Sequence, residues 1–333
     1  MDLSTTYCRL ALKNPLIASA SPLTGTLDGL RRLEDAGVAA VVLPSIFEEQ
    51  VEAEARELER LSALAEGFAE ASAFFPARTL PGSGPYRQLE LVRRARDALS
   101  IPVIASLNGA TAGGWTSFAR LAEEAGASAL ELNVYFPATD LALDSPSVEA
   151  RPVAILEAVR HSVKIPVGMK LSRDYSAPGA LIMALDAAGA EGFALFNRFY
   201  QPDIDLVSLR TVLQPALSTR DEIRPGLMWI AALAGMLRGA LAATTGVETE
   251  AEVIKYLLAG ADAVMSTSAL LRHGPEHART ILDGLVAWGE ARGFPSVAAL
   301  RGRMIDALAG GPASADRAAY SRILQGFRDT ALP

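Results

Sequence analysis

The chain has 333 residues, of which 50% are hydrophobic and 21% are charged, and its formal net charge at pH 7 is −7. This length is enough to bury a large core in one domain without disulfides or metal ions. The acidic balance and the lack of a basic block argue against a protein that binds nucleic acid. The one cysteine, Cys8, excludes an intrachain disulfide and a Cys-ligated zinc or iron–sulfur site built by this chain alone, and it fits a reducing compartment.

The first residues, Met1–Ser4, show neither the basic nor the apolar region of a secretory signal. No apolar run reaches the roughly 18 to 20 residues that a transmembrane helix needs. We therefore expect a cytoplasmic protein that does not bind membranes.

One local pattern recurs along the chain. An Ala-rich stretch ends on glycine, a few small residues follow, and a short apolar run comes next, as in residues 35–43, 124–132, 187–195 and 258–265. Glycine readily takes the left-handed conformation found just after the end of a helix. Short apolar runs between helices are typical of parallel strands that are buried on both faces.

Further apolar runs, two of which open after a proline, complete a set of eight expected strands. The strands are expected near residues 15–19, 38–43, 102–106, 128–133, 166–171, 192–196, 239–243 and 262–266. Helical stretches separate them, for example at 86–100, 115–126, 151–163 and 249–259. Eight such units without a break in composition predict an α/β fold, a single (β/α)₈ TIM barrel domain over 1–333. We expect the barrel at about 12–292 and extra C-terminal helices within 295–333. The alternative, an open doubly wound sheet, needs a Gly-rich turn after the first strand, which Ser19–Pro22 does not provide.

Two connections are longer than usual and leave the barrel at the carboxyl ends of the strands. Residues 44–85 include an acidic helix at 48–73, in which we expect Glu48 and its neighbouring carboxylates on a solvated face. A charged docking surface is the alternative role of this helix. Residues 198–225 follow the sixth strand, and both connections are candidate lids over the barrel mouth.

Lysine and asparagine are rare in this chain, with four residues of each. Asn108, Asn133 and Asn197 fall at or just past the ends of the third, fourth and sixth strands, and Lys170 falls at the end of the fifth. In a barrel these ends meet at one mouth, where active sites lie. An amine beside three amides binds a planar polar ring and stabilises negative charge on it. The alternative is that each asparagine only caps a turn.

Small hydroxyl residues follow the seventh and eighth strands. The expected binding residues in these loops are Thr244, Thr245, Gly246, Ser266, Thr267 and Ser268. Thr249 and Glu252 have the spacing of a capping box that opens the next helix. Loops in these two places form the usual phosphate site of a barrel, from backbone N–H groups and a helix N-terminus. Ordinary helix caps are the alternative explanation.

The remaining candidates are more ordinary. His161 lies before the fifth strand, at the end of the barrel opposite the mouth, and we expect it on the surface. His273 and His277 are four residues apart but lack cysteine or carboxylate partners nearby in the sequence, so we predict no metal site. Cys8 is expected to be a buried small hydrophobic residue.

Taken together, these residues resemble the dihydroorotate dehydrogenase family of FMN-dependent barrels over about residues 12–307. The matching pieces are residues 12–16, 131–134, 166–171, 197, 246–249, 258–261 and 293–302. The resemblance implies that the cofactor is FMN and that Lys170 faces the N1/O2 edge of the flavin. It also implies that Asn133 and Asn197 line the flavin and substrate pocket, and that the hydroxyl loops hold the phosphate. By the same resemblance the flavin ring runs along Ser19, Ala20 and Ser21, and we add Ser45 and Asn108 as cofactor-binding candidates.

The sequence departs from the family pattern where the substrate is expected. In the family, the asparagine after the fourth strand leads within three residues to a Cys or Ser base and then to Pro-Asn. Here Phe136 holds the base position and Ala138 holds the position of the substrate-binding asparagine. Pro44 replaces a family lysine, and residues 75–85 show no counterpart of the family's substrate loop.

We therefore expect an FMN-dependent oxidoreductase that acts on a CH–CH or related bond of a small-molecule substrate, which is not dihydroorotate or is bound differently from it. Tyr135 is the nearest replacement acid or base, with a ring packed on the flavin or lid as its alternative role. Arg198 is a candidate for binding a substrate carboxylate. Two other functions stay open: a genuine dihydroorotate dehydrogenase of pyrimidine biosynthesis with an unusual base, and a flavin-bearing redox subunit without turnover of its own.

The route by which electrons leave also follows from the resemblance. Membrane-linked members of the family carry an N-terminal helical region that reaches quinone, whereas this sequence starts almost directly at its first expected strand. Other members pass electrons to a partner subunit that carries FAD and an iron–sulfur cluster. We expect a homodimer, the commonest oligomer, that passes electrons to a soluble acceptor or a separate soluble redox protein.

Overall fold

The computed structural model describes residues 1–50, 84–109, 115–134, 136, 138–198, 202–212, 216–308, 321 and 325. Most of the predicted acidic helix at 48–73, most of the segment 75–85, Tyr135, and most of residues 309–333 lie outside the described residues.

In the described part of the chain, eight parallel strands close into a barrel, which confirms the predicted fold. In order around the barrel they are β3 (Leu16–Ala18), β4 (Ala40–Val42), β6 (Val103–Gly109), β7 (Ala129–Val134), β8 (Val167–Leu171), β9 (Gly192–Leu195), β12 (Ala240–Ala243) and β13 (Ala263–Ser266). A short additional strand, β5 (Ile46–Phe47), pairs with the end of β6. The expected strands and the observed strands agree in place and differ by a few residues at their ends.

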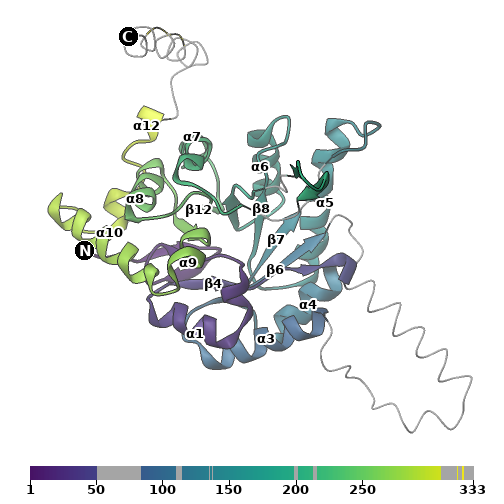
Figure 1. Cartoon of the computed structure of the whole chain (residues 1–333), viewed down its shortest axis with the longest axis horizontal. Coiled ribbons are helices and arrows are strands. Elements are labelled where there is room, and N and C mark those ends of the chain that lie inside the picture. The colour runs from purple at the N-terminus through teal and green to yellow at the C-terminus, as the bar shows by residue number, and fades with distance from the viewer. Residues whose placement is uncertain are drawn as a thin grey trace, which may run out of the picture.

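Helices follow the strands and form a ring around them, as Figure 1 shows. They are α1 (Leu27–Asp35), α3 (Gly84–Ala98), α4 (Trp115–Ala125), α5 (Ser145–Ser162), α6 (Pro178–Ala187), α7 (Ile223–Leu233), α8 (Glu250–Ala259), α9 (Ser268–His273) and α10 (His277–Ala291). Two short helices, α11 (Val297–Leu300) and α12 (Ile305–Leu308), pack outside the barrel against α8. The predicted extra C-terminal helices are therefore present.

Helix α5 begins earlier than the predicted start at Arg151. Its first residue is Ser145, and the Asp144 carboxylate accepts a hydrogen bond of 2.9 Å from the Ser147 N–H. This cap satisfies one of the N–H groups of the first turn, which have no partner within the helix. Pro152 lies inside the helix, and the cap at Asp144 marks its start.

A hairpin closes the barrel at the amino ends of the strands. It is formed by β1 (Thr5–Tyr7) and β2 (Leu10–Leu12), and its Tyr7 and Cys8 are buried inside the barrel, as expected for Cys8. A Cβ atom on Gly192 would lie 2.4 Å from the Cys8 Sγ, so this strand position admits only glycine without rearrangement. The hairpin therefore fills the barrel interior at the amino ends of the strands, and the mouth lies at the carboxyl ends.

The predicted capping box at the start of α8 is confirmed. Both the N–H and the hydroxyl of Thr249 donate to the buried Glu252 carboxylate at 2.9 Å, and Arg220 donates to it at 3.0 Å. Burial alone raises the pKa of Glu252, but these hydrogen bonds outweigh burial and hold it below the ordinary value. The carboxylate is thus ionised and ties α8 to the segment before α7.

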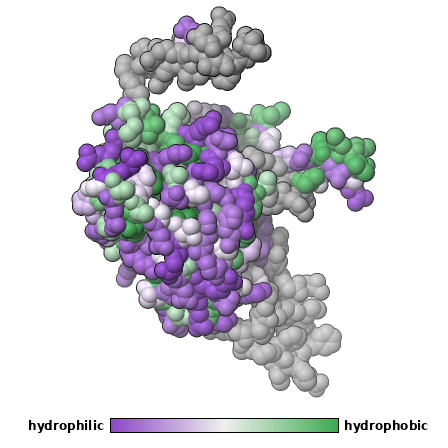
Figure 2. Space-filling view, turned by 60° about the vertical axis from the view of Figure 1, so that its left-hand side comes forward, coloured by the Kyte–Doolittle hydropathy of each residue, from purple (hydrophilic) through white to green (hydrophobic). Residues whose placement is uncertain are grey.

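The connection from β9 to α7 is not a plain loop. It contains an antiparallel hairpin, β10 (Asp203–Asp205) and β11 (Arg210–Val212), whose turn exposes Leu206, Val207 and Leu209. Figure 2 shows the hydrophobic side chains of this hairpin on a projection from the surface.

One expectation about the other long connection is wrong. Glu48 is only 8% exposed and does not lie on a solvated face. It packs against the end of β6, where a Cβ on Gly109 would lie 2.6 Å from its Oε2 atom. An acidic run in the sequence does not show which of its members turns inward.

His161 lies on the surface, as expected, whereas His273 has a nearby carboxylate, Glu248, that the sequence did not show. His161 is exposed on α5, and its ring contacts the Glu157 carbonyl oxygen at 2.6 Å. His273 and His277 both contact Glu248, one through its side chain and one through its backbone carbonyl. Across the described residues no group of His, Cys, Asp and Glu is arranged to hold a metal ion. Nor does any described helix have the length and apolar character required to span a membrane.

Candidate active site

Three of the predicted polar residues lie side by side at the barrel mouth. Asn108 on β6 is the cross-strand neighbour of Asn133 on β7, and Asn133 is the neighbour of Lys170 on β8. Both asparagines are 9% exposed, and the Lys170 side chain is 12% exposed. Because alternate residues of a barrel strand point inward, this shared register gathers one amine and two amides in one layer.

Asn197 joins this group from the loop after β9. Its backbone N–H donates to the Leu171 carbonyl oxygen at 2.7 Å, which continues the sheet pairing beyond the strand. Its side-chain amide donates to the Asn133 Oδ1 at 2.9 Å. The two amides therefore orient each other across the mouth rather than capping their own turns.

A carboxylate that the sequence reasoning missed lies just below this layer. Glu131 precedes Asn133 by two residues on β7, and its Oε1 lies 3.7 Å from the Lys170 Nζ. The Ser106 hydroxyl donates to the same oxygen at 3.4 Å, and Ser45 contacts Ser106 at 2.8 Å. The signal that could have identified Glu131 is an acidic residue within a buried strand.

A cavity of about 180 Å³, here called the cradle cavity, extends from Lys170 toward the loops after β12 and β13. It is lined by Ser19, Ala20, Lys170, Phe196, Asn197, Arg198, Ser218, Thr244, Thr245, Gly246, Val247, Met265, Ser266, Thr267 and Ser268. The structure thus places the predicted ring-binding residues Ser19, Ala20 and Lys170 on the same cavity as the predicted phosphate-binding residues.

Four other predicted cofactor residues, Asn133 among them, do not line the cradle cavity. Ser21 begins a short turn, and its N–H donates to the Thr24 hydroxyl at 3.0 Å. The Ser45 hydroxyl contacts the Ser106 hydroxyl at 2.8 Å beneath the mouth, and Asn108 and Asn133 lie side by side on β6 and β7. Tyr135, the candidate acid or base, lies outside the described residues.

The end of the cradle cavity near β12 is rich in polar groups that bond to one another. Gly246 has a positive φ of 75°, and its N–H donates to the Ser218 hydroxyl at 3.2 Å. The Ser218 N–H in turn donates to the Ser268 hydroxyl at 3.0 Å. Ser266 donates to the Val247 carbonyl oxygen and Thr245 to the Phe196 carbonyl oxygen, so these two hydroxyls also support the loops. Ser218 had not been identified from the sequence because it belongs to the distant β9–α7 connection.

Two observations are compatible with a phosphorylated ligand in this cavity. The Ser19 hydroxyl is buried and has no hydrogen-bond partner among the described residues. Thr267 precedes α9 without capping it through its side chain, so the N–H groups of that first turn receive no acceptor from it. A polar ring and a phosphate supply the acceptors that such groups require.

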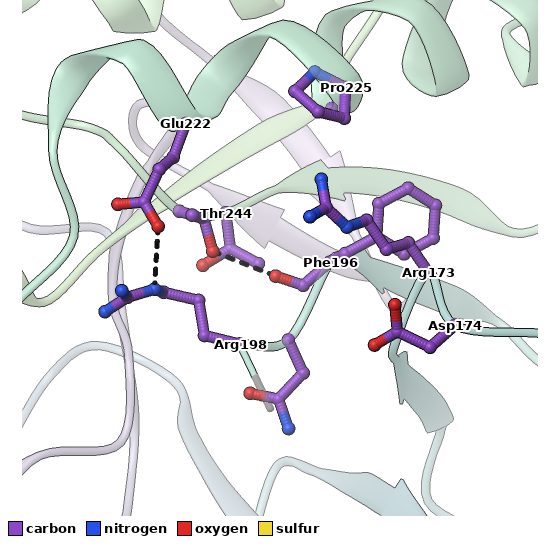
Figure 3. A pocket seen from close by; sticks show the side chains of 10 residues that line it. Arg173, Asp174, Phe196, Arg198, Glu222, Pro225 and Thr244 are labelled. Carbon is purple, nitrogen blue, oxygen red and sulfur yellow. Dashed lines mark hydrogen bonds and ion pairs between the residues drawn. The ribbon is translucent and has the colours of Figure 1, made fainter. Parts of the chain in front are cut away.

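A second cavity of about 340 Å³, here called the arginine cavity, adjoins the first (Figure 3). It is lined by Arg173, Asp174, Phe196, Asn197, Arg198, Glu222, Pro225, Gly226, Thr244 and Thr245. The Arg198 Nε lies 3.0 Å from the Glu222 carboxylate, and its Nη1 donates to the Ala216 carbonyl oxygen. Arg198, the candidate for binding a substrate carboxylate, therefore already forms an ion pair with Glu222.

The residue at the family's base position is packed against an arginine. The Arg151 guanidinium carbon lies 3.7 Å from the centroid of the Phe136 ring. This distance is typical of a cation–π contact. The phenyl ring carries no group that accepts a proton, and Ala138 beyond it is exposed.

Comparisons with known proteins place these observations in a family. Residues 2–288 match the family model described as dihydroorotate dehydrogenase, and the chain belongs to this family. A putative dihydroorotate dehydrogenase A (fumarate) of Aeropyrum pernix is 31% identical over 216 residues, which cover 62% of this chain and 69% of that protein. The catalytic subunit of dihydroorotate dehydrogenase B (NAD(+)) of Pyrococcus abyssi is 28% identical over 294 residues, 86% of this chain and 94% of that subunit. The corresponding subunit of Methanothermobacter thermautotrophicus is 27% identical over 305 residues, 89% of this chain and 96% of that subunit.

Proposed function

We propose that this chain is an FMN-dependent oxidoreductase that acts on a CH–CH or related bond of a small molecule. The observation that carries the proposal is the convergence of Lys170, Asn133 and Asn197 at the mouth of a barrel in this family, beside a cavity that extends to the hydroxyl loops. An ammonium and two mutually oriented amides suit the polar edge of a flavin ring.

The residues around the cradle cavity divide the binding of FMN between them. Ser19 and Ala20 would contact the ring, and the loops at Thr245–Gly246 and Ser266–Ser268 would hold the phosphate. When bound, FMN supplies the two-electron chemistry that no side chain of this protein can supply. The positive charge of Lys170 would then stabilise negative charge on the ring.

We also propose that dihydroorotate is not the preferred substrate. Phe136 offers no base, Ala138 offers no amide, and Pro44 stands where the family has a lysine. Positioned proton transfer typically contributes about 10²- to 10⁴-fold to a rate, so its loss alone removes most of an ordinary turnover. Tyr135 is our candidate for the group that moves the proton. Arg198 is our candidate for a substrate carboxylate, which would replace Glu222 as its partner.

The route by which electrons leave the flavin is a further part of the proposal. Two of the relatives named above are catalytic subunits of an enzyme that uses NAD(+). We propose that this chain forms a homodimer and passes electrons to a soluble acceptor or redox protein.

The experiment that tests the function begins with the purified, yellow protein. Denaturation and chromatography should release FMN, and release of FAD, or no uptake of FMN, would contradict the proposal. Anaerobic bleaching is then followed with dihydroorotate, with other dihydropyrimidines and with reduced ferredoxin. Fast bleaching by dihydroorotate would favour a genuine dihydroorotate dehydrogenase, and bleaching by ferredoxin alone would favour a redox subunit.

A further inference from the structure

The buried carboxylate of Glu131 has no role in the proposed function as described so far. Its side chain is 4% exposed, and its Oε1 is shared between the Ser106 hydroxyl and the Lys170 ammonium. Its Oε2 has no hydrogen-bond partner among the described residues. Burial of a carboxylate with an unsatisfied oxygen lowers the stability of the fold. A glutamate beneath the mouth therefore calls for a physical reason.

The groups below Glu131 do not supply a countercharge. Gly168 is its cross-strand neighbour, and a Cβ there would lie 2.8 Å from the Cys8 Sγ and 3.5 Å from the Tyr7 hydroxyl. Burial raises the pKa of Tyr7 well above its ordinary value, and the charge of Glu131 raises it further. Tyr7 is therefore neutral, and in the described part of the chain the ion pair of Glu131 is with Lys170.

The contact between Glu131 and Lys170 is a charge interaction rather than a hydrogen bond. At 3.7 Å, the Nζ–Oε1 distance is longer than the 2.7 to 3.2 Å usual for an N–H···O bond. No hydrogen bond from the ammonium to another described residue is present, so its N–H donors are free to face the cradle cavity, which Lys170 lines. The Glu131 carboxylate thus attracts the Lys170 ammonium toward the barrel interior, and the ammonium N–H groups stay available to a ligand in the cavity.

We propose that Glu131 is a positioning residue for Lys170, which it fixes at the mouth while offsetting part of its positive charge. This inference rests on the proposed FMN site. The offset weakens the stabilisation of negative charge on the flavin, so Glu131 lowers the reduction potential relative to a site with Lys170 alone. The pair, rather than the lysine, sets how strongly the ring attracts electrons.

The test compares two-electron midpoint potentials of bound FMN, measured by anaerobic dye equilibration. Glu131→Gln keeps the size of the side chain and removes its charge. Loss of a buried charge a few ångströms from Lys170 should favour the reduced form by about tenfold. Tenfold corresponds to a rise of about 30 mV for a two-electron couple. Glu131→Met, of similar volume, should shift the potential in the same direction and serves if the amide variant does not fold.

Two controls separate positioning from general effects. Glu191→Gln removes a carboxylate at the other end of the barrel, where Glu191 binds Arg9 and Arg160, and it should leave the potential unchanged. In a Lys170→Gln background, Glu131→Gln should produce a smaller rise, because no ammonium remains for the carboxylate to position and offset.

Each result bears on the inference in a defined way. An unchanged potential in yellow Glu131→Gln protein would overturn the inference and leave the proposed function intact. An equal rise in the Lys170→Gln background would show that Glu131 acts on the ring directly, which also overturns it. Wild-type protein that takes up no FMN would contradict the proposed function, and the inference with it.

Discussion

Replacement of Lys170 by glutamine is the most informative perturbation of the barrel itself. The ammonium and the Glu131 carboxylate lie 3.7 Å apart, and their side chains are 12% and 4% exposed, so solvent screens them little. At this distance and an effective dielectric constant of about 20, their attraction amounts to about 4 kcal/mol. Removal of one partner from a buried pair typically costs about 3–5 kcal/mol, because the other charge is left uncompensated. We therefore expect Lys170→Gln to destabilise the protein by about 3–4 kcal/mol.

The assay is a double-mutant cycle by urea denaturation. The double variant Lys170→Gln with Glu131→Gln should recover most of the loss, because it leaves no buried charge. In the FMN-loaded protein, Lys170→Gln should also lower the flavin potential and weaken FMN retention. A loss of stability below about 1 kcal/mol for the single variant would place the pair in the range of exposed ion pairs and refute the reasoning. Additive losses in the double variant would refute it equally.

Three further predictions test other parts of the molecule. Phe136→Cys combined with Ala138→Asn should raise steady-state turnover of dihydroorotate by about 10²-fold or more, because it restores a base and an amide; unchanged turnover would show that another group limits the reaction. Glu252→Gln should lower stability at neutral pH, since the pKa of this carboxyl is depressed in the folded state. The difference from wild type, followed by urea denaturation, should disappear as the pH falls below the ordinary value of 4.5, and a constant difference would contradict this sign. Gly192→Ala should destabilise by about 1–3 kcal/mol through overpacking against Cys8, and Cys8→Ala in the same chain should relieve part of the loss; no loss would mean that the hairpin shifts freely.

The barrel could be predicted because its signals are local. The helix end at Gly260 has a φ of 112°, which glycine adopts without strain, and the apolar run that follows it forms β13. The capping box of Thr249 and Glu252 marks the start of α8 with two residues that are close in sequence. Such signals depend on neighbours along the chain, and eight repeats of the βα unit then leave few ways to bury every strand.

The site could be predicted in part, for a related reason. In a parallel barrel all carboxyl ends of the strands meet, so the positions of Asn133, Lys170 and Asn197 at strand ends were enough to bring them together. The structure adds that Asn197 orients Asn133, which depends on the path of the loop after β9. No periodic pattern encodes that path.

Other features were decided only by the tertiary structure. The sequence alone shows a glutamate at position 131, but not that closure of the barrel places its carboxylate between Ser106 and Lys170. Likewise Arg198 is paired with Glu222, and Ser218 reaches the hydroxyl loops, because the β9–α7 connection folds back over the mouth. Local sequence determines which segments become strands and helices, since backbone preference and burial act over a few residues. The partner of a buried charge depends on contacts between residues far apart in the chain, and these exist only once the barrel has closed.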